Sequence, residues 1–127
     1  MESRAIFIQC KTHWSLWLSS HKRVGKKIAI YGAAQRACSF INLLDLGKYL
    51  DFVVDDHHQK QKFLMPGSKL PIKPSSALVE EKIDICLMAT NPDSQASIIK
   101  NQQFFLEQGG KFFSIYEGVP KDGSDRI

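Results

Sequence analysis

The sequence predicts an α/β fold with a mostly parallel five-stranded sheet and helices on both faces. Two observations predict it. Short apolar runs alternate with segments of helical periodicity, which is the pattern of βαβ crossovers. Residues 27–36, KIAIYGAAQR, form an apolar run that breaks at Gly32 and leads directly into the start of a helix. A strand, a glycine turn and a helix in immediate succession are typical of a Rossmann-like three-layer domain, and they leave backbone N–H groups that can bind a phosphate.

An amphipathic helix is expected ahead of this domain, over residues 3–24. Its apolar positions recur at helical spacing, at Ile6, Cys10, Trp14, Trp17 and Leu18. The two tryptophans predict that this face packs on the sheet, with a partner chain or a further domain as the alternative surface. The expected organisation is a packed helix over 1–25, the Rossmann-like domain over 26–116 and a flexible polar tail over 117–127.

The remaining elements follow from apolar runs and helix-capping residues. Strands are expected at residues 27–31, 49–54, 70–72, 83–89 and 111–116, and the two longer helices at residues 35–47 and 92–108. Ser75 or Ser76 is the expected cap of a brief helix that ends near residue 81, and Asn91 with Pro92 is the expected start of the last helix. Right-handed crossovers then predict the strand order 3-2-1-4-5, in which the turns after the first and fourth strands face each other across a crevice.

The composition is that of one ordinary globular domain. The chain has 127 residues, of which 43% are hydrophobic and 24% charged. Its three cysteines are isolated, so we expect no metal site, no disulfide framework and a reducing, cytoplasmic location. No stretch approaches the ~20 apolar residues of a membrane helix. The net charge of +4 permits a nucleic-acid partner, but we expect the basic cluster at residues 21–27 to be a solvated helix end.

The glycine turn and the residues after the second strand are the candidate ligand site. Alanines stand where a dinucleotide fingerprint has its second and third glycines, which disfavours NAD or FAD. Asp55 or Asp56 is the expected acceptor for a sugar hydroxyl, with a loop turn or helix cap as the alternative role. The long loop at residues 57–71 contains the turn Pro66-Gly67 and offers Lys60 and Lys62 to a phosphate.

Several of these segments together resemble a known family. The segments IAIYGAAQR, FVVDD, KQKFLMPGSKLPI and GGKFFSIY, with an asparagine after the fourth strand, are similar to the C-terminal domain of SAM-dependent sugar C-methyltransferases. The resemblance implies that a full enzyme has an N-terminal zinc-binding region and a middle SAM-binding catalytic domain. It also implies that this end domain helps to hold a nucleotide-linked sugar.

The resemblance also assigns individual residues. Gly32 and Ala33 match the glycine turn of the family, and Asp55, Lys60 and Asn91 match its polar residues. Arg36 stands where the family has lysine, and Lys62, Thr90 and Gln95 replace a glycine, a tryptophan and a glutamate. The predicted ligand-binding residues are Gly32, Ala33, Ala34, Gln35, Arg36, Asp55, Asp56, Lys60, Pro66, Gly67, Thr90 and Asn91.

No catalytic residue is predicted, because the chain has no Tyr/His/Glu constellation for deprotonating a sugar carbon and no second glycine turn for SAM. We therefore expect a module that binds a nucleotide-linked sugar or another phosphorylated small molecule, with SAM only where a separate catalytic domain is present. A methyltransferase chain or a second copy is the expected protein partner. The alternatives are a small enzyme that uses NAD(P) or a sugar nucleotide, and an interaction module with a vestigial pocket.

Overall fold

The computed structural model describes the backbone of residues 2–120 and the side chains from residue 8 to residue 120. Its centre is a five-stranded sheet in the order β3-β2-β1-β4-β5, and all four strand pairs are parallel. The predicted sheet and strand order are confirmed. The strands are β1 (Ile28–Tyr31), β2 (Phe52–Val54), β3 (Ile72–Lys73), β4 (Ile85–Met88) and β5 (Lys111–Ser114).

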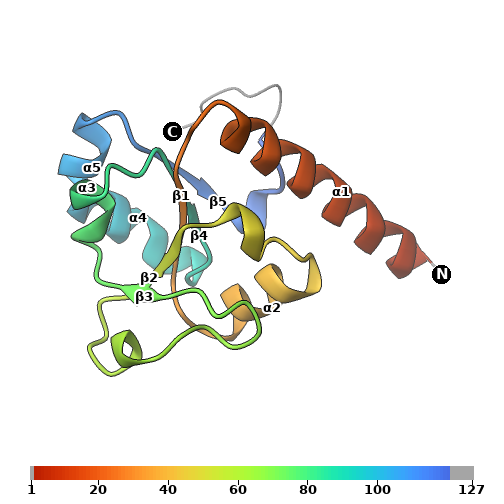
Figure 1. Ribbon diagram of the computed structural model, residues 1–127, viewed down its shortest axis with the longest axis horizontal. Helices are drawn as coiled ribbons and strands as arrows, with labels where there is room; N and C mark the ends of the chain where they lie inside the picture. Colours follow the sequence, from red (N-terminus) through yellow and green to blue (C-terminus); the bar gives the residue numbers. More distant parts are fainter. Residues whose placement is uncertain (1, 121–127) are drawn as a thin grey trace.

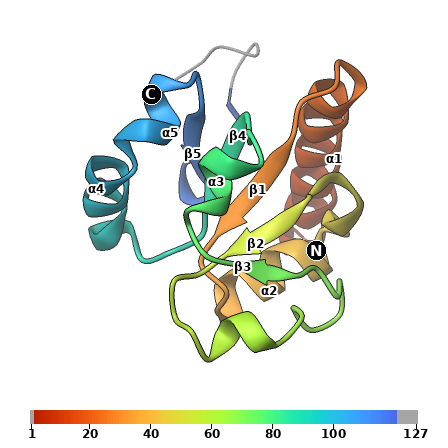
Figure 2. The same ribbon diagram turned by 60° about the vertical axis from the view of Figure 1, so that its left-hand side comes forward.

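Helices cover both faces of this sheet, as Figures 1 and 2 show. One face carries α1 (Glu2–Arg23) and α2 (Gln35–Leu43), and the other carries α3 (Ala77–Glu80), α4 (Pro92–Asn101) and α5 (Gln103–Glu107). Successive side chains of a strand point to opposite faces. In β1, Ile28 and Ile30 join the core under α1 and α2, whereas Ala29 joins the core under α3 and α5. The predicted three-layer arrangement is therefore present.

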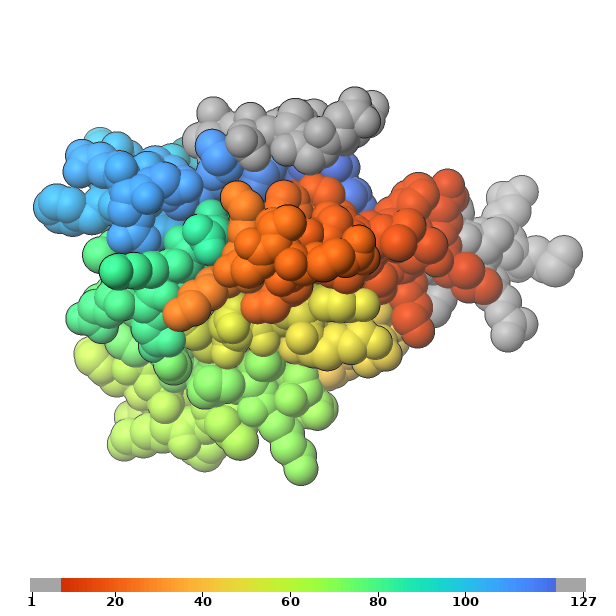
Figure 3. All heavy atoms as spheres, turned by 45° about the horizontal axis from the view of Figure 1, so that its top comes forward, coloured from red at the N-terminus to blue at the C-terminus, as the bar shows by residue number. Residues whose placement is uncertain are grey.

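The second half of α1 packs on the sheet. Trp14 and Trp17 are only 3% and 8% exposed, and their rings meet Phe40 and Phe113 edge to face. The tryptophans thus fill the core on this face. Figure 1 shows the first half of α1 extending beyond the body of the domain, and Figure 3 shows the coloured atoms of α1, which begin at residue 8, along one edge of the molecule. No helix among the described residues is both long and apolar enough to cross a membrane.

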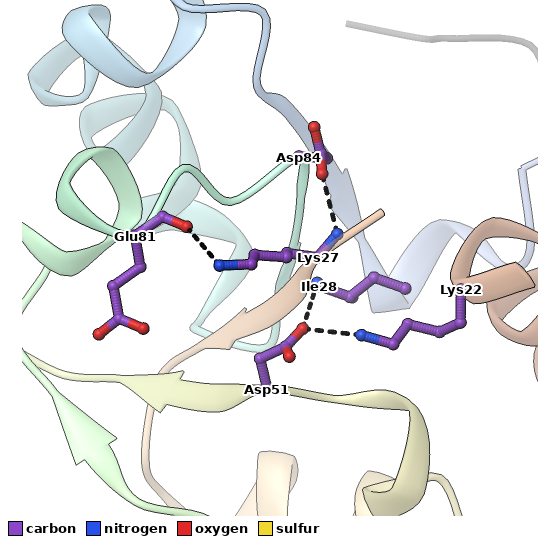
Figure 4. Close-up of polar contacts among 6 residues, drawn as sticks. All are labelled: Lys22, Lys27, Ile28, Asp51, Glu81 and Asp84. Atoms are coloured by element: carbon purple, nitrogen blue, oxygen red, sulfur yellow. Dashed lines mark hydrogen bonds and ion pairs between the residues drawn. The ribbon is translucent and has the colours of Figure 1, made fainter. Parts of the chain in front are cut away.

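Hydrogen bonds join the start of β1 to the residues just before β2 and β4 (Figure 4). The Asp51 carboxylate, just before β2, accepts hydrogen bonds from the Ile28 N–H at 2.8 Å and from Lys22 at 3.0 Å. The Asp84 carboxylate, just before β4, accepts the Lys27 N–H at 2.8 Å, and the Lys27 ammonium donates to the Glu81 carbonyl at 3.2 Å. Two cations of the basic cluster therefore have structural partners.

Several element ends differ from the sequence-based prediction. The helix α2 ends at Leu43 rather than near residue 47, because Asp45 adopts φ +55° and the Leu46 N–H returns to the Ile41 carbonyl. This is the hydrogen bond of a Schellman motif, and it buries Leu46 in the core. The predicted helix over 92–108 is interrupted at Gln102, which leaves helical geometry at φ −112°, ψ 43°.

The predicted start or end of three further helices or strands is also wrong. The strand expected over 49–54 begins only at Phe52, because a 3-10 turn, η1 (Gly47–Tyr49), precedes it. The strand expected over 111–116 ends at Ser114, whose hydroxyl accepts the Tyr116 N–H and starts the 3-10 turn η3 (Ile115–Glu117). Ser76 has helical dihedral angles and makes no side-chain cap at α3. Most of the expected tail, residues 121–127, lies outside the described residues.

Candidate functional site: the junction of two loops

The loops after β1 and β4 touch at the carboxyl edge of the sheet. Gly32, directly after β1, adopts φ +106°, and a Cβ placed there would lie 2.8 Å from the Thr90 Cγ2. A side chain at this position would therefore be strained and would collide with Thr90. The two loops that the strand order brings together lie in direct contact, and Gly32 is the residue that permits it.

Asp55 fixes the glycine turn from the side of β2. One of its carboxylate oxygens accepts the Ala33 N–H at 2.9 Å, and the other accepts the His57 N–H at 2.9 Å. Lys60 lies beside it, 3.9 Å from the same carboxylate, and donates to the Ala33 carbonyl at 3.0 Å. The structure therefore gives both residues a role in holding the Ala33 backbone.

Asp56 points to the other side of the sheet. Its carboxylate accepts the Tyr31 hydroxyl at 3.1 Å and the Ser75 N–H at 2.8 Å. Burial, and then the charge and hydrogen bond of Asp56, raise the pKa of Tyr31 well above its usual value, so the phenol remains protonated at physiological pH. Asp56 thus ties β1 to the loop before α3.

The first backbone N–H groups of α2 are hydrogen-bond donors, and the helix itself supplies no acidic side chain beside them. Its N-cap residue, Ala34, has no side chain that can accept a hydrogen bond, and the first turn contains no acidic residue. The first N–H groups of a helix lack intrahelical acceptors and carry partial positive charge. Arg36 adds a full positive charge to this same turn. Lys60 lies 3.9 Å from the Asp55 carboxylate and offsets its charge, so the positive charge of Arg36 makes the local field favour an anionic ligand.

Tyr116 connects Arg36 to the end of β4. The Arg36 guanidinium donates to the Tyr116 hydroxyl at 3.0 Å and lies 5.5 Å from the centre of its ring. The Tyr116 hydroxyl in turn donates to the Ala89 carbonyl at 3.1 Å. The sequence predicts Tyr116 only as the end of the last strand, and its contact with Arg36 is not predicted. The available signal was a tyrosine immediately after the fifth strand, at the same edge as the glycine turn.

The Asn91 side chain works as a helix cap. Its carboxamide oxygen accepts the Asp93 N–H at 2.9 Å, and Pro92 opens α4 as predicted. Gln95, one turn later, is only 9% exposed and donates to the Thr90 carbonyl at 3.1 Å. The Thr90 hydroxyl is buried and has no hydrogen-bond partner among the residues that the structure describes. The loop at the end of β4 is thus fixed by α4, apart from this one hydroxyl.

Comparisons with known proteins identify the family. Residues 4–116 match the model of the C-methyltransferase C-terminal domain. The chain belongs to the C-methyltransferase C-terminal domain family. It is also 34% identical over 90 residues to the C-methyltransferase NovU of Streptomyces niveus, a stretch that covers 69% of this chain and 21% of that relative. The chain therefore spans about a fifth of that C-methyltransferase. The family match includes most of α1, whereas the motifs used for the resemblance begin near residue 26.

Within this C-methyltransferase C-terminal domain, the Pro66-Gly67 turn lies away from the junction. The Pro66 carbonyl accepts the Asn42 side-chain amide at 2.9 Å, near the far end of α2. Gly67 adopts φ +81°, and a Cβ there would lie within 2.7 Å of three Asn42 side-chain atoms. This segment of the resemblance thus packs the long loop onto α2.

The two larger cavities of the described chain are lined by residues other than the predicted ligand-binding residues. One, of about 660 Å³, lies between α4, the ends of β4 and β5, and Glu117–Pro120; the other, of about 780 Å³, lies between α1 and Gly118–Pro120. None of the twelve predicted ligand residues lines either cavity. Within the described residues, no group of three or more His, Cys, Asp or Glu side chains is arranged to hold a metal ion.

Proposed function

We propose that this C-methyltransferase C-terminal domain binds the phosphoryl groups of a nucleotide-linked sugar where the Gly32 turn meets Thr90. The observation that carries the proposal is the start of α2, which has an uncapped N-terminus and Arg36 in its first turn but no acidic residue there. An anion beside a helix N-terminus and a guanidinium is stabilised by both charge and hydrogen bonds. Glycine at position 32 lets the loop after β4 lie against this turn, because a Cβ there would collide with Thr90.

Family membership supports the class of ligand. The relative NovU is named a C-methyltransferase, and this chain corresponds to a fifth of its length. We infer that methyl transfer requires groups outside the matched domain, and that this domain contributes to substrate binding. The resemblance noted from the sequence gives that substrate as a nucleotide-linked sugar.

We infer that SAM is not the ligand of this junction. A bound adenosyl group places its ribose hydroxyls against the acidic residue after the second strand. Here each carboxylate oxygen of Asp55 accepts a backbone N–H group. We also infer that Asp55 and Asp56 hold loops rather than act as a base, because each accepts hydrogen bonds from two loop or strand groups, and this disfavours a small enzyme built on this site.

A titration tests the proposed function. We expect UDP-glucose, used as the probe, to shift the backbone amide resonances of residues 33–38 in ¹⁵N spectra at millimolar concentration, with UDP giving smaller shifts. The R36Q variant is expected to weaken binding at least threefold, because it removes one charge-assisted hydrogen bond. The matched control is K100Q, which removes an exposed cation from the last turn of α4, at the end of that helix away from the junction. Equal affinities for R36Q, K100Q and the native chain, or no shifts at 33–38, would contradict the proposal.

The exposed side of α1 favours a second role, which is contact with another polypeptide. Ile8, in the projecting first half, and Leu16, in the half that packs on the sheet, are 55% and 62% exposed. Leu16 also lines the groove of about 780 Å³ between α1 and the 118–120 segment. A helical segment without tertiary contacts is only marginally stable in water. We propose that this surface is covered in the functional assembly.

Sedimentation velocity over a range of concentrations tests this second role. If the surface joins two copies, the native chain forms a dimer that the L16E variant abolishes. The control is V24E, because Val24 is 71% exposed and follows α1. A strictly monomeric native chain would exclude self-association and leave only a different protein as the occupant.

A further inference from the structure

Tyr116 is the feature from which we draw a further inference. It belongs to η3, at the far end of the chain from the glycine turn, and yet its hydroxyl lies between the Arg36 guanidinium and the Ala89 carbonyl. Its backbone N–H is held by the Ser114 hydroxyl at 3.2 Å, and Ser114 is 7% exposed at the end of β5. The phenol is therefore anchored both through its hydroxyl and through its backbone.

The hydrogen atoms of this contact can be assigned without ambiguity. A carbonyl oxygen only accepts, so the single phenolic hydrogen goes to Ala89. A guanidinium only donates, so the hydroxyl oxygen receives one N–H of Arg36. Arg36 has five such N–H groups, and it makes no other hydrogen bond or ion pair within the described part of the chain. Four donors of the guanidinium are left for a ligand.

The same contact fixes where the guanidinium lies. Ala89 is the last residue before Thr90, and its carbonyl carbon is 3.6 Å from the position that a Cβ on Gly32 would occupy. Arg36 therefore reaches back over the first turn of α2 to the place where the two loops meet. The Arg36 charge is thus held, through the Tyr116 hydroxyl, near the residue that precedes Thr90.

This position of the Arg36 guanidinium is unfavourable unless another group stabilises it. A cation in the first turn of a helix is repelled by the helix dipole. The side chain is also long and exposed, and fixing it costs rotamer entropy. The ring of Tyr116 offsets both effects, because the guanidinium lies 5.5 Å from its centre and bonds to its hydroxyl. A lysine could occupy the same space but could not stack in this planar way.

We propose that Tyr116 is a positioning residue, which holds the Arg36 guanidinium at the junction so that its remaining N–H groups take the phosphoryl oxygens of the ligand. This inference rests on the proposed function, and it assigns to η3 a part in a site otherwise built from the other end of the chain. Tyr116 itself does not contact the phosphoryl group in this arrangement.

The test is a double-mutant cycle with inorganic pyrophosphate as the probe. Dissociation constants are measured from ¹⁵N amide shifts for the native chain, Y116F, R36Q and the double variant. The change to phenylalanine keeps the ring but removes the hydroxyl, and we expect affinity to fall about three- to tenfold, the effect of one hydrogen bond. In the R36Q background the same change should have no further effect, because the guanidinium that it positions is gone.

Two controls separate positioning from stability. Y49F removes a phenol from η1, which precedes β2 at the opposite edge of the sheet, and it should bind pyrophosphate like the native chain. The Arg36 side-chain Nε–H resonance should be sharp and dispersed in the native chain and averaged in Y116F. Melting temperatures of all variants are recorded alongside.

The outcomes are distinguishable. A native chain that binds neither pyrophosphate nor UDP-glucose overturns the proposed function and this inference together. If the native chain binds and Y116F binds equally well, the inference fails alone. If Y116F weakens binding by the same factor with and without Arg36, Tyr116 acts on the fold in general, and its positioning role is refuted.

Discussion

The carboxylate of Asp55 accepts the backbone N–H of Ala33 at 2.9 Å, so the acidic residue after β2 holds the turn that follows β1. The second oxygen of the same carboxylate holds the His57 N–H, and Lys60 closes the arrangement on the Ala33 carbonyl. The sequence predicts Asp55 as one of two candidate acceptors for a sugar hydroxyl. In the structure, Asp55 shapes the loop on which a ligand would rest.

We expect D55A to lower the free energy of unfolding by about 2 kcal/mol, because two backbone donors lose their acceptor in a partly buried position. The side chain of Asp55 is 19% exposed. Urea unfolding at neutral pH measures the change. The matched control is D45N, since the carboxylate of Asp45 is 68% exposed and pairs with Lys48 only at 3.8 Å, and asparagine tolerates the positive φ of this position. Equal losses in the two variants would contradict a structural role for Asp55.

The contact between Gly67 and Asn42 gives a second prediction. G67A places a Cβ at positive φ and within 2.7 Å of the Asn42 side chain, which must then give up its bond to Pro66. We expect a loss of about 2 kcal/mol in the free energy of unfolding, from backbone strain and one hydrogen bond.

Two variants separate these causes. G25A adds a Cβ at φ +86° with nothing within 4 Å, so it should show the strain alone, about 1 kcal/mol. In an N42A background, G67A should cost no more than G25A. A full loss in that background would show that Asn42 is not the obstacle.

The buried thiol of Cys86 predicts a dependence of stability on pH. Burial raises the pKa of Cys86 far above its ordinary value of 9.0, so the folded chain keeps the thiol neutral whereas the unfolded chain ionises it. The unfolded state then binds fewer protons above about pH 9, and stability must fall as pH rises, by at most ~1.4 kcal/mol per pH unit from this group. Tyr31 adds to the fall above pH 10, because its pKa is raised in the same direction.

Urea unfolding of the native chain and of C86A between pH 8 and pH 10.5 measures this effect. The C86A variant is less stable throughout, because a buried side chain is shortened, but its stability should fall less steeply with pH. Parallel curves for the two proteins would show that Cys86 ionises equally in both states.

Much of the fold follows from local patterns. The apolar run of β1 and the turn at Gly32 are adjacent in the sequence, and so are Asn91, Pro92 and the first turn of α4, so each could be predicted from neighbouring residues. The end of α2 could not, because it depends on burying Leu46 in a core formed by distant strands. The break at Gln102 is likewise absent from the helical periodicity of residues 92–108.

The same distinction applies to the candidate site, of which one part follows from local sequence and the other depends on the tertiary structure. The sequence by itself determined the order of strands and helices, the glycine turn and the family, because these depend on periodicity, turn residues and motifs within short segments. Only the tertiary structure decided what the polar residues do: Asp55 and Lys60 hold the backbone of Ala33, Pro66-Gly67 packs on Asn42, and Tyr116 reaches Arg36. The physical reason is that a hydrogen bond depends on distances of about 3 Å between groups that lie tens of residues apart, and only the packed sheet sets those distances.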